Sequence, residues 1–215
     1  MSVRVLMLTQ LIGTVLILAF LPGNLVKLLA FLLLWLVTFG RLAKNEIIFY
    51  LVVCAFFTVM NALSLKQGVF AFNYPDVLGM PVYELAMWGF YLLHTAKMLS
   101  GPIPLGPEKP VLILLFFYCV AFSIIPDQSL LLMVTAILLG IGLYFYHEKF
   151  DIAYVLYMVI LGAAIEYTGV LSGQWHYPDD PWSGVPFWFV TLWGGVGLFL
   201  RRIALPLVYG DKESK

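Results

Sequence analysis

The chain has 215 residues, of which 62% are hydrophobic and 11% are charged, and its mean hydropathy is +0.97. A water-soluble domain carries roughly 45–50% apolar and about 25% charged residues, so this composition excludes an ordinary soluble fold and predicts an integral membrane protein. The formal net charge of zero offers no basic field to a polyanion, and we therefore expect no nucleic-acid partner.

Apolar runs separated by Pro, Gly or charged residues predict an all-α integral membrane fold with eight transmembrane helices. The first run follows Arg4 without a small-residue cleavage site, so we interpret it as a span and not as a cleaved leader. Pro22-Gly23-Asn24 and Pro126-Asp127-Gln128 are turn-forming segments, and each predicts a tight helical hairpin. The predicted spans are 5–21, 25–39, 47–65, 81–98, 111–125, 129–146, 152–171 and 186–200.

Basic residues are distributed unevenly between the two sides of this arrangement, with ten on one side and two on the other. Because short cytoplasmic loops carry an excess of Lys and Arg, both termini are predicted to be cytoplasmic, in an inner or plasma membrane or an endomembrane. An odd number of spans would place the termini on opposite sides and abolish this sorting. The larger group is Arg4, Arg41, Lys44, Lys97, Lys109, Lys149, Arg201, Arg202, Lys212 and Lys215, and the smaller is Lys27 and Lys66.

The two halves of the sequence resemble each other at an offset of about 105 residues. Residues 1–105 and 106–209 are therefore predicted to be two tandem four-helix repeats, followed by a polar tail at 210–215. An even number of spans in each repeat gives both the same orientation, so we expect them to be related by an axis along the membrane normal. The matches include Lys44-Asn45-Glu46 with Lys149-Phe150-Asp151, Gly68 with Gly173, Phe72-x-Tyr74-Pro75-Asp76 with Trp175-x-Tyr177-Pro178-Asp179, Gly79-x-Pro81 with Gly184-x-Pro186, and Trp88-Gly89 with Trp193-Gly194.

Two acidic residues lie within predicted spans, near their non-cytoplasmic ends: Glu84 and Glu166. Ionisable groups in a membrane are costly and are candidates for function. A carboxyl away from water can hold its proton at neutral pH, and two carboxyls in different surroundings can divide the acid and base roles. Asn61 matches Glu166 in the first repeat, and Phe189 matches Glu84 in the second. Glu84, Glu166 and Asn61 are therefore the predicted catalytic group, with a structural alternative in which each Glu only joins helices through hydrogen bonds.

Aromatic residues near the same ends are candidates for contact with an apolar substrate, although Trp and Tyr at span ends also serve as interfacial anchors. The outer loops add acids and one histidine. His176-x-x-Asp179-Asp180 does not fix a ligand count, and no phosphate loop or other cofactor motif is present, so neither a metal nor a cofactor is expected. The substrate-binding candidates are Tyr74, Trp88, Trp175, Tyr177 and Trp193, and the loop candidates are Asp76, His176, Asp179 and Asp180.

A longer pattern carries a family resemblance. It comprises Glu166-x-x-Gly169-Val170-x-x-Gly173-x-Trp175-x-Tyr177, then Gly184-Val185-Pro186 and Trp193. This pattern resembles membrane carotenoid-modifying proteins of the carotenoid 1,2-hydratase type and of the heterodimeric lycopene cyclase type. In the first half, Gly79-Met80-Pro81-Val82-Tyr83-Glu84 resembles the cyclase family's Gly-Leu-Pro-x-Glu-Glu motif, with Tyr83 in place of the first Glu. The resemblance implies proton-initiated chemistry on a polyene by intramembrane carboxyls, here Glu84 and Glu166.

The leading functional hypothesis is a membrane protein that binds a lipidic or isoprenoid, carotenoid-like substrate in its outer-leaflet half and acts as an acid–base cyclase, hydratase or isomerase. A small-solute or ion transporter is the first alternative, since parallel repeats with intramembrane acids occur in carriers. The second alternative is an accessory subunit of a larger membrane complex, which leaves a protein partner open.

Overall fold

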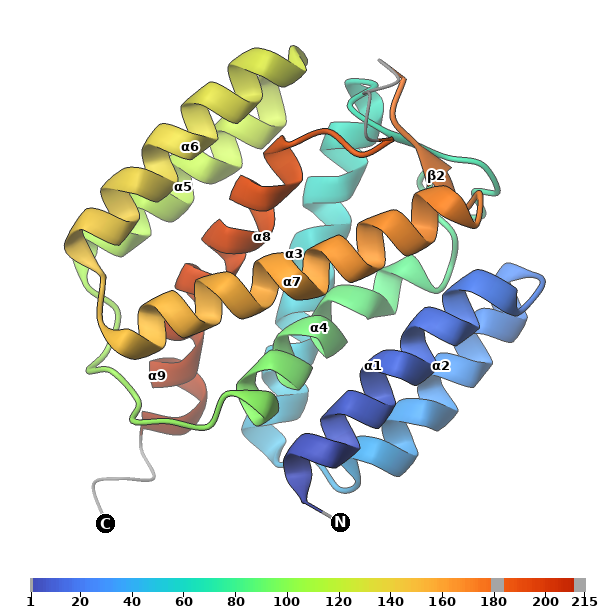
Figure 1. Cartoon of the computed structure of the whole chain (residues 1–215), viewed down its shortest axis with the longest axis horizontal. Helices are drawn as coiled ribbons and strands as arrows, with labels where there is room; N and C mark the ends of the chain where they lie inside the picture. Colours follow the sequence, from blue (N-terminus) through green and yellow to red (C-terminus); the bar gives the residue numbers. More distant parts are fainter. Residues whose placement is uncertain (1, 179–183, 211–215) are drawn as a thin grey trace. The chain divides into compact units, whose positions relative to one another are not determined.

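Helices make up nearly all the regular structure in the computed structural model, which describes residues 2–178 and 184–210 (Figure 1). Each predicted span contains a helix, so the all-α prediction is confirmed for the described residues. The helices are α1 (Val3–Phe20), α2 (Asn24–Phe39), α3 (Lys44–Lys66), α4 (Glu84–Met98), α5 (Lys109–Ile124), α6 (Gln128–Phe145), α7 (Lys149–Leu171), α8 (Trp188–Phe199), the π-helix η1 (Leu200–Ala204) and α9 (Leu205–Tyr209).

Five helical segments among the described residues are long and apolar enough to cross a membrane: Val3–Phe20, Lys44–Lys66, Gln128–Phe145, Lys149–Leu171 and Trp188–Tyr209. The helices Asn24–Phe39 and Lys109–Ile124 are apolar but shorter. Many of the outward side chains are large and hydrophobic, such as Leu36 at 70% exposure. Such a surface is costly in water and suits a lipid environment, which agrees with the predicted membrane location.

The last predicted span was placed too short. Its helix does not end at residue 200 but continues through η1 and α9 to Tyr209. Arg201 and Arg202, expected beyond the helix end, are part of this continuation. Arg202 pairs with the fully buried Asp151 of α7, and the Arg201 guanidinium lies over the rings of Phe150 and Tyr154 at 5.6 and 5.9 Å. These partners on α7 allow two charged residues to continue an apolar helix.

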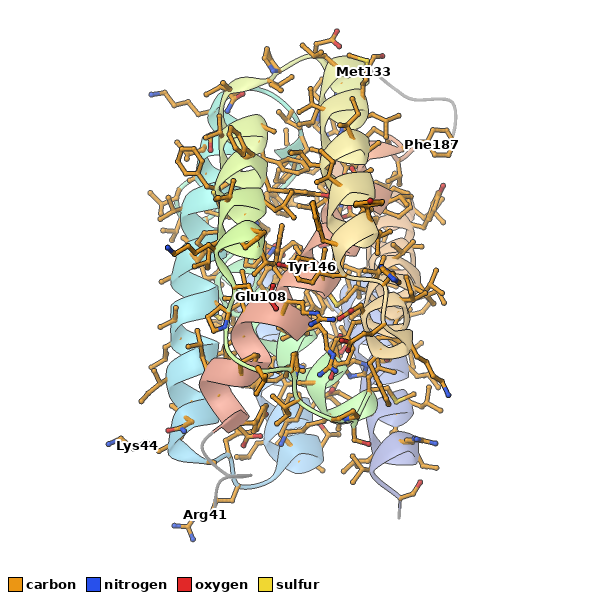
Figure 2. All side chains as sticks on the ribbon, turned by 90° about the vertical axis from the view of Figure 1, so that its left-hand side faces the viewer. Arg41, Lys44, Glu108, Met133, Tyr146 and Phe187 are labelled. Carbon is orange, nitrogen blue, oxygen red and sulfur yellow. The ribbon has the colours of Figure 1, made fainter. Side chains whose placement is uncertain are left out.

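The described helices divide into two compact units. Unit 1 comprises Met1–Met98 and Ala164–Val185, and unit 2 comprises Leu99–Ala163 and Pro186–Lys215. In unit 1, α1 and α2 form an antiparallel hairpin, α1 also packs against α4, and α3 packs along α4 (Figure 1). Figure 2 shows Arg41 and Lys44 projecting at the same end of this unit, next to the connection between α2 and α3.

Unit 1 also contains a short antiparallel ladder. Strand β1 (Ala71–Phe72) pairs with β2 (Trp175–His176), with Ala71 opposite His176 and Phe72 opposite Trp175. The sequence did not predict this pairing, because two-residue strands carry no periodicity. The ladder brings the segment after α3 beside the segment after α7, about 100 residues later in the chain.

In unit 2, α5 and α6 form the second hairpin, and α8 packs against both (Figure 1). Glycines allow close approaches to α8: a Cβ on Gly197 would lie 2.6 Å from the backbone oxygen of Tyr154 on α7. At the start of α5, Tyr146 donates a hydrogen bond of 3.2 Å to Glu108, and Figure 2 shows the two side chains next to each other. These contacts fix helices whose outward faces are apolar.

Candidate functional site

Glu166 lies in the last two turns of α7, and its side chain is held by two donors from the segment that follows the helix. The indole Nε1 of Trp175 donates to Oε2 at 3.1 Å, and the hydroxyl of Tyr177 donates to the same oxygen at 2.7 Å. The carboxyl is buried, with 8% of the residue exposed. The sequence-based grouping of these three residues is therefore realised as a direct hydrogen-bonded cluster.

The end of α7 explains why this cluster forms. Gly173 adopts a φ of +69°, which L-residues with side chains rarely adopt, and this conformation turns the chain back toward the helix. Gln174 N then donates to the Gly169 carbonyl at 2.8 Å. A Cβ on Gly169 would lie 2.0 Å from the Trp175 ring, so the indole packs directly on the helix backbone. The glycines thus set the position of the indole that holds Glu166.

Tyr177 remains a hydrogen-bond donor over a wide pH range. Burial raises the pKa of its phenol well above the usual 10.0, and the neighbouring Glu166 carboxyl raises it further. Only 6% of the residue is exposed. The protonated hydroxyl can therefore support charge on Glu166 without losing its own proton.

Glu84 is positioned by a braced turn at the start of α4. Its backbone N–H bonds to the Pro81 carbonyl at 3.0 Å, and Asp76 accepts a hydrogen bond of 2.9 Å from the Val82 amide. The Glu84 carboxyl receives the side-chain amide of Asn61 from α3 at 3.1 Å, and the Trp88 indole is a further hydrogen-bond partner. Asn61, Glu84 and Trp88 were all predicted site residues.

The two carboxyls share one electrostatic neighbourhood in unit 1. Glu84 and Glu166 interact electrostatically, and the buried Tyr91 of α4 interacts with both. The two carboxyls accept hydrogen bonds from neutral amide, indole and phenol groups, which belong to Asn61, Trp175 and Tyr177. Neutral donors favour the ionised form of a carboxyl less strongly than an arginine partner would, so they leave proton exchange more accessible. This arrangement suits groups that exchange protons.

Sequence reasoning missed a group of three residues, two of which directly precede Glu84 and Trp175 in the chain. Lys27 of α2 is only 4% exposed, and its ammonium donates to Gln174 Oε1 at 2.5 Å. The Tyr83 hydroxyl donates to the same oxygen at 3.3 Å, and the ammonium lies 5.6 Å from the centre of the Tyr83 ring. Lys27 was counted as an outer basic residue at the start of a predicted span. Its burial depends on which face of α2 it occupies.

The remaining predicted residues make other contacts. Trp193 is in unit 2, where its ring covers Gly162. Tyr74 is 66% exposed, and its backbone carbonyl accepts from the Asn24 amide at 2.7 Å. The exposed His176 pairs with Asn73 at 2.6 Å, and Asp76 braces the turn before Glu84. Asp179 and Asp180 lie outside the described residues.

Within the described part of the chain, no group of three or more His, Cys, Asp or Glu side chains is arranged to hold a metal ion. Comparisons of the sequence and the structure with protein-family models, with curated proteins and with solved structures gave no match. Any assignment of function therefore rests on the site itself.

Proposed function

We propose that this chain is an integral membrane protein that binds a long apolar molecule of lipid or isoprenoid type and acts on it by acid–base chemistry. The observation that carries the proposal is the pair Glu84 and Glu166, two acids within predicted spans that interact with each other and are held by neutral donors. Intramembrane acids are costly, and a purely structural role does not require two of them in one neighbourhood.

Two carboxyls in one site can carry out acid–base chemistry on a polyene. A protonated carboxyl donates its proton to a carbon–carbon double bond, which leaves a carbocation. The second carboxyl, in its ionised form, removes a proton from a neighbouring carbon, and the result is isomerisation without redox change. If a second double bond of the polyene first attacks the cation and closes a ring, the same loss of a proton gives cyclisation. If water adds to the cation instead and loses a proton to the second carboxyl, the result is hydration. Trp88 and Trp175, whose indoles bind the two carboxyls, would be the aromatic rings beside the developing cation.

Deuterium incorporation tests the proposal. Membranes containing the protein are incubated in D₂O with acyclic isoprenoid polyenes, and the extracted products are analysed by mass spectrometry. We expect carbon-bound deuterium with the wild-type protein and a loss of about 100-fold in its rate with Glu166→Gln or Glu84→Gln, since general acid–base groups contribute roughly 10²–10⁴-fold. Glu108→Gln in unit 2 is the matched control and should retain the activity. Equal incorporation by all variants would remove the acid–base proposal and favour a carrier or an accessory subunit.

We also propose that the chain comprises eight spans in two tandem repeats with cytoplasmic termini. Corresponding contacts in the two halves support the repeat. Glu46 accepts the Ala43 amide and pairs with Lys97 at 2.7 Å. In the second half, 105 residues later in each case, Asp151 accepts the Glu148 amide and pairs with Arg202.

Glycine conformations add to this support. Gly68 and its counterpart Gly173 have φ values of +72° and +69°. Gly79 and its counterpart Gly184 have φ values of +78° and +73°, and a Cβ on either would lie 3.5 Å from a side chain of the preceding long helix. Unrelated segments are not expected to share turns, ion pairs and packing at one offset.

A further inference from the structure

Lys27 is an ammonium in an apolar setting that lacks a negative partner among the described residues. The residue is 4% exposed, and in residues 2–178 and 184–210 no carboxylate lies within 4.0 Å of its nitrogen. Its recorded partners are the Gln174 amide oxygen at 2.5 Å and the Tyr83 ring at 5.6 Å. Burying a cation is costly unless an anion or several acceptors compensate for the lost water.

The side chain of Gln174 is held in place beside this ammonium. Gln174 Nε2 donates to the Ser172 carbonyl at 3.2 Å, and this bond directs Oε1 toward Lys27 and the Tyr83 hydroxyl. A Lys ammonium has three N–H donors, and with residues 2–178 and 184–210 this one makes a single hydrogen bond. Two donors are therefore available to an incoming acceptor.

The position of Lys27 links it to the acid pair. Tyr83 directly precedes Glu84, and Gln174 directly precedes Trp175, whose indole holds Glu166. Leu25 and Val26, at the start of α2, are 62% and 47% exposed, whereas Lys27 in the same turn faces the interior of the unit. Lys27 is thus joined by its partners to the two chain segments that carry or hold the acids.

We propose that Lys27, with Gln174 and Tyr83, binds the anionic end group of an amphiphile, such as a carboxylate or phosphate, and so selects isoprenoids or lipids that carry one. This inference rests on the proposed binding of a long apolar ligand and names the substrate class more narrowly. The anion supplies the charge that the described residues do not, and it accepts the remaining ammonium hydrogens.

Retinoic acid and retinol form a matched pair of probes, since both have the same polyene and differ in the charge of the end group. Binding is followed by quenching of tryptophan fluorescence in phosphatidylcholine nanodiscs at pH 7.5. We expect the wild-type protein to bind retinoic acid about tenfold more tightly than retinol, in line with one charge-assisted hydrogen bond. Lys27→Met should abolish this preference and Lys27→Arg should retain it. Lys66→Met removes an exposed lysine of α3 and should leave it unchanged.

The outcomes separate the two proposals. Equal affinities for the two probes in the wild-type protein, or a preference that survives in a folded Lys27→Met variant, overturn the anion site and leave the acid pair untouched. Failure to bind either probe overturns the proposed ligand class as well. Nanodiscs of phosphatidylglycerol distinguish the source of the anion. Weaker retinoic acid binding there identifies a phospholipid head group as the occupant, whereas unchanged binding identifies an isoprenoid acid.

Discussion

Asn61 on α3 donates its side-chain amide to Glu84 on α4 across 3.1 Å, and in the proposed repeat Asn61 is the counterpart of the second acid, Glu166. The position that holds a carboxyl in the second half thus holds, in the first half, a partner for a carboxyl. Each half of the chain contributes one acid to the pair, but from helices that do not correspond in the proposed repeat: α4 in the first half and α7 in the second.

Loss of the Asn61 amide should weaken the α3–α4 contact. We expect Asn61→Leu, which keeps the volume, to lower the free energy of unfolding by about 1 kcal/mol, the usual size of a hydrogen bond between membrane helices. Unfolding in SDS followed by circular dichroism measures the change. A double-mutant cycle with Glu84→Leu isolates the pair, and strictly additive effects would show that the bond contributes nothing.

Tyr177 should make stability depend on alkaline pH. Its folded-state pKa is raised above 10.0, so the unfolded chain loses the phenol proton at a lower pH than the folded chain does. The contribution of the protonated phenol to the free energy of unfolding is therefore present below about pH 10 and is lost as pH rises toward the folded-state pKa. We expect the decline in unfolding free energy between pH 9 and 11 to be less steep in Tyr177→Phe than in the wild-type protein. The exposed Tyr74→Phe is the control, and it should follow the wild-type curve. Identical slopes for all three proteins would contradict the burial of the phenol.

Gly169 should be intolerant of even one added methyl group. A Cβ there would lie 2.0 Å from the Trp175 ring, which is too rigid to yield without moving away from Glu166. We expect Gly169→Ala to cost about 1–3 kcal/mol of stability, as overpacking does, and to change the tryptophan emission spectrum. Gly140→Ala on α6 meets open space and should be neutral or slightly stabilising. Equal effects of the two substitutions would show that the indole does not pack on the α7 backbone.

The helices and part of the site were predictable from the sequence because their signals are local. Long apolar runs between turn residues gave the helix positions. The contacts of Glu166 with Trp175 and Tyr177 lie within eleven residues of one another, across one glycine turn. Composition and short spacing are sufficient for features of this kind.

Other features depend on helix rotation and on long-range packing, which a single sequence does not specify. The burial of Lys27 was missed because counting charges by side treats a basic residue at a span end as exposed. Its partner, Gln174, lies 147 residues away. The continuation of α8 to Tyr209 was missed for a similar reason. Two adjacent arginines after an apolar run are typical of the end of a span, and the sequence alone does not show that Asp151 pairs with them.

The topology can be tested by labelling single cysteines in a variant that lacks Cys54 and Cys119. With ten of twelve basic residues predicted on one side, the loop at Tyr74 should be external and that at Lys44 cytoplasmic. We expect a membrane-impermeant maleimide added to intact cells to label Tyr74→Cys and to spare Lys44→Cys, while both react after permeabilisation. The reverse pattern would invert the proposed orientation, and equal labelling from outside would exclude an odd number of spans between them as well.

The ion pairs at corresponding positions of the two halves should differ in strength because they differ in burial. Asp151 is fully buried and accepts hydrogen bonds from Arg202 and from the Glu148 backbone, whereas the Lys97 side chain that pairs with Glu46 is 25% exposed. Removing the Asp151 charge leaves two arginines without it, and a buried cation that loses its partner typically costs about 3–5 kcal/mol. We therefore expect Asp151→Asn to lower the unfolding free energy by about that amount and Glu46→Gln to lower it less.

SDS unfolding measures both variants, and Glu148→Gln provides the control, because that side chain is 65% exposed although it also contacts Arg202. Its loss should cost less than about 1 kcal/mol, as for surface ion pairs. High salt should reduce the effect of Glu148→Gln and leave that of Asp151→Asn nearly unchanged, since buried charges are screened little. Equal losses of unfolding free energy in Asp151→Asn and Glu148→Gln would mean that water reaches Asp151. The buried ion pair would then not explain why the helix continues through η1.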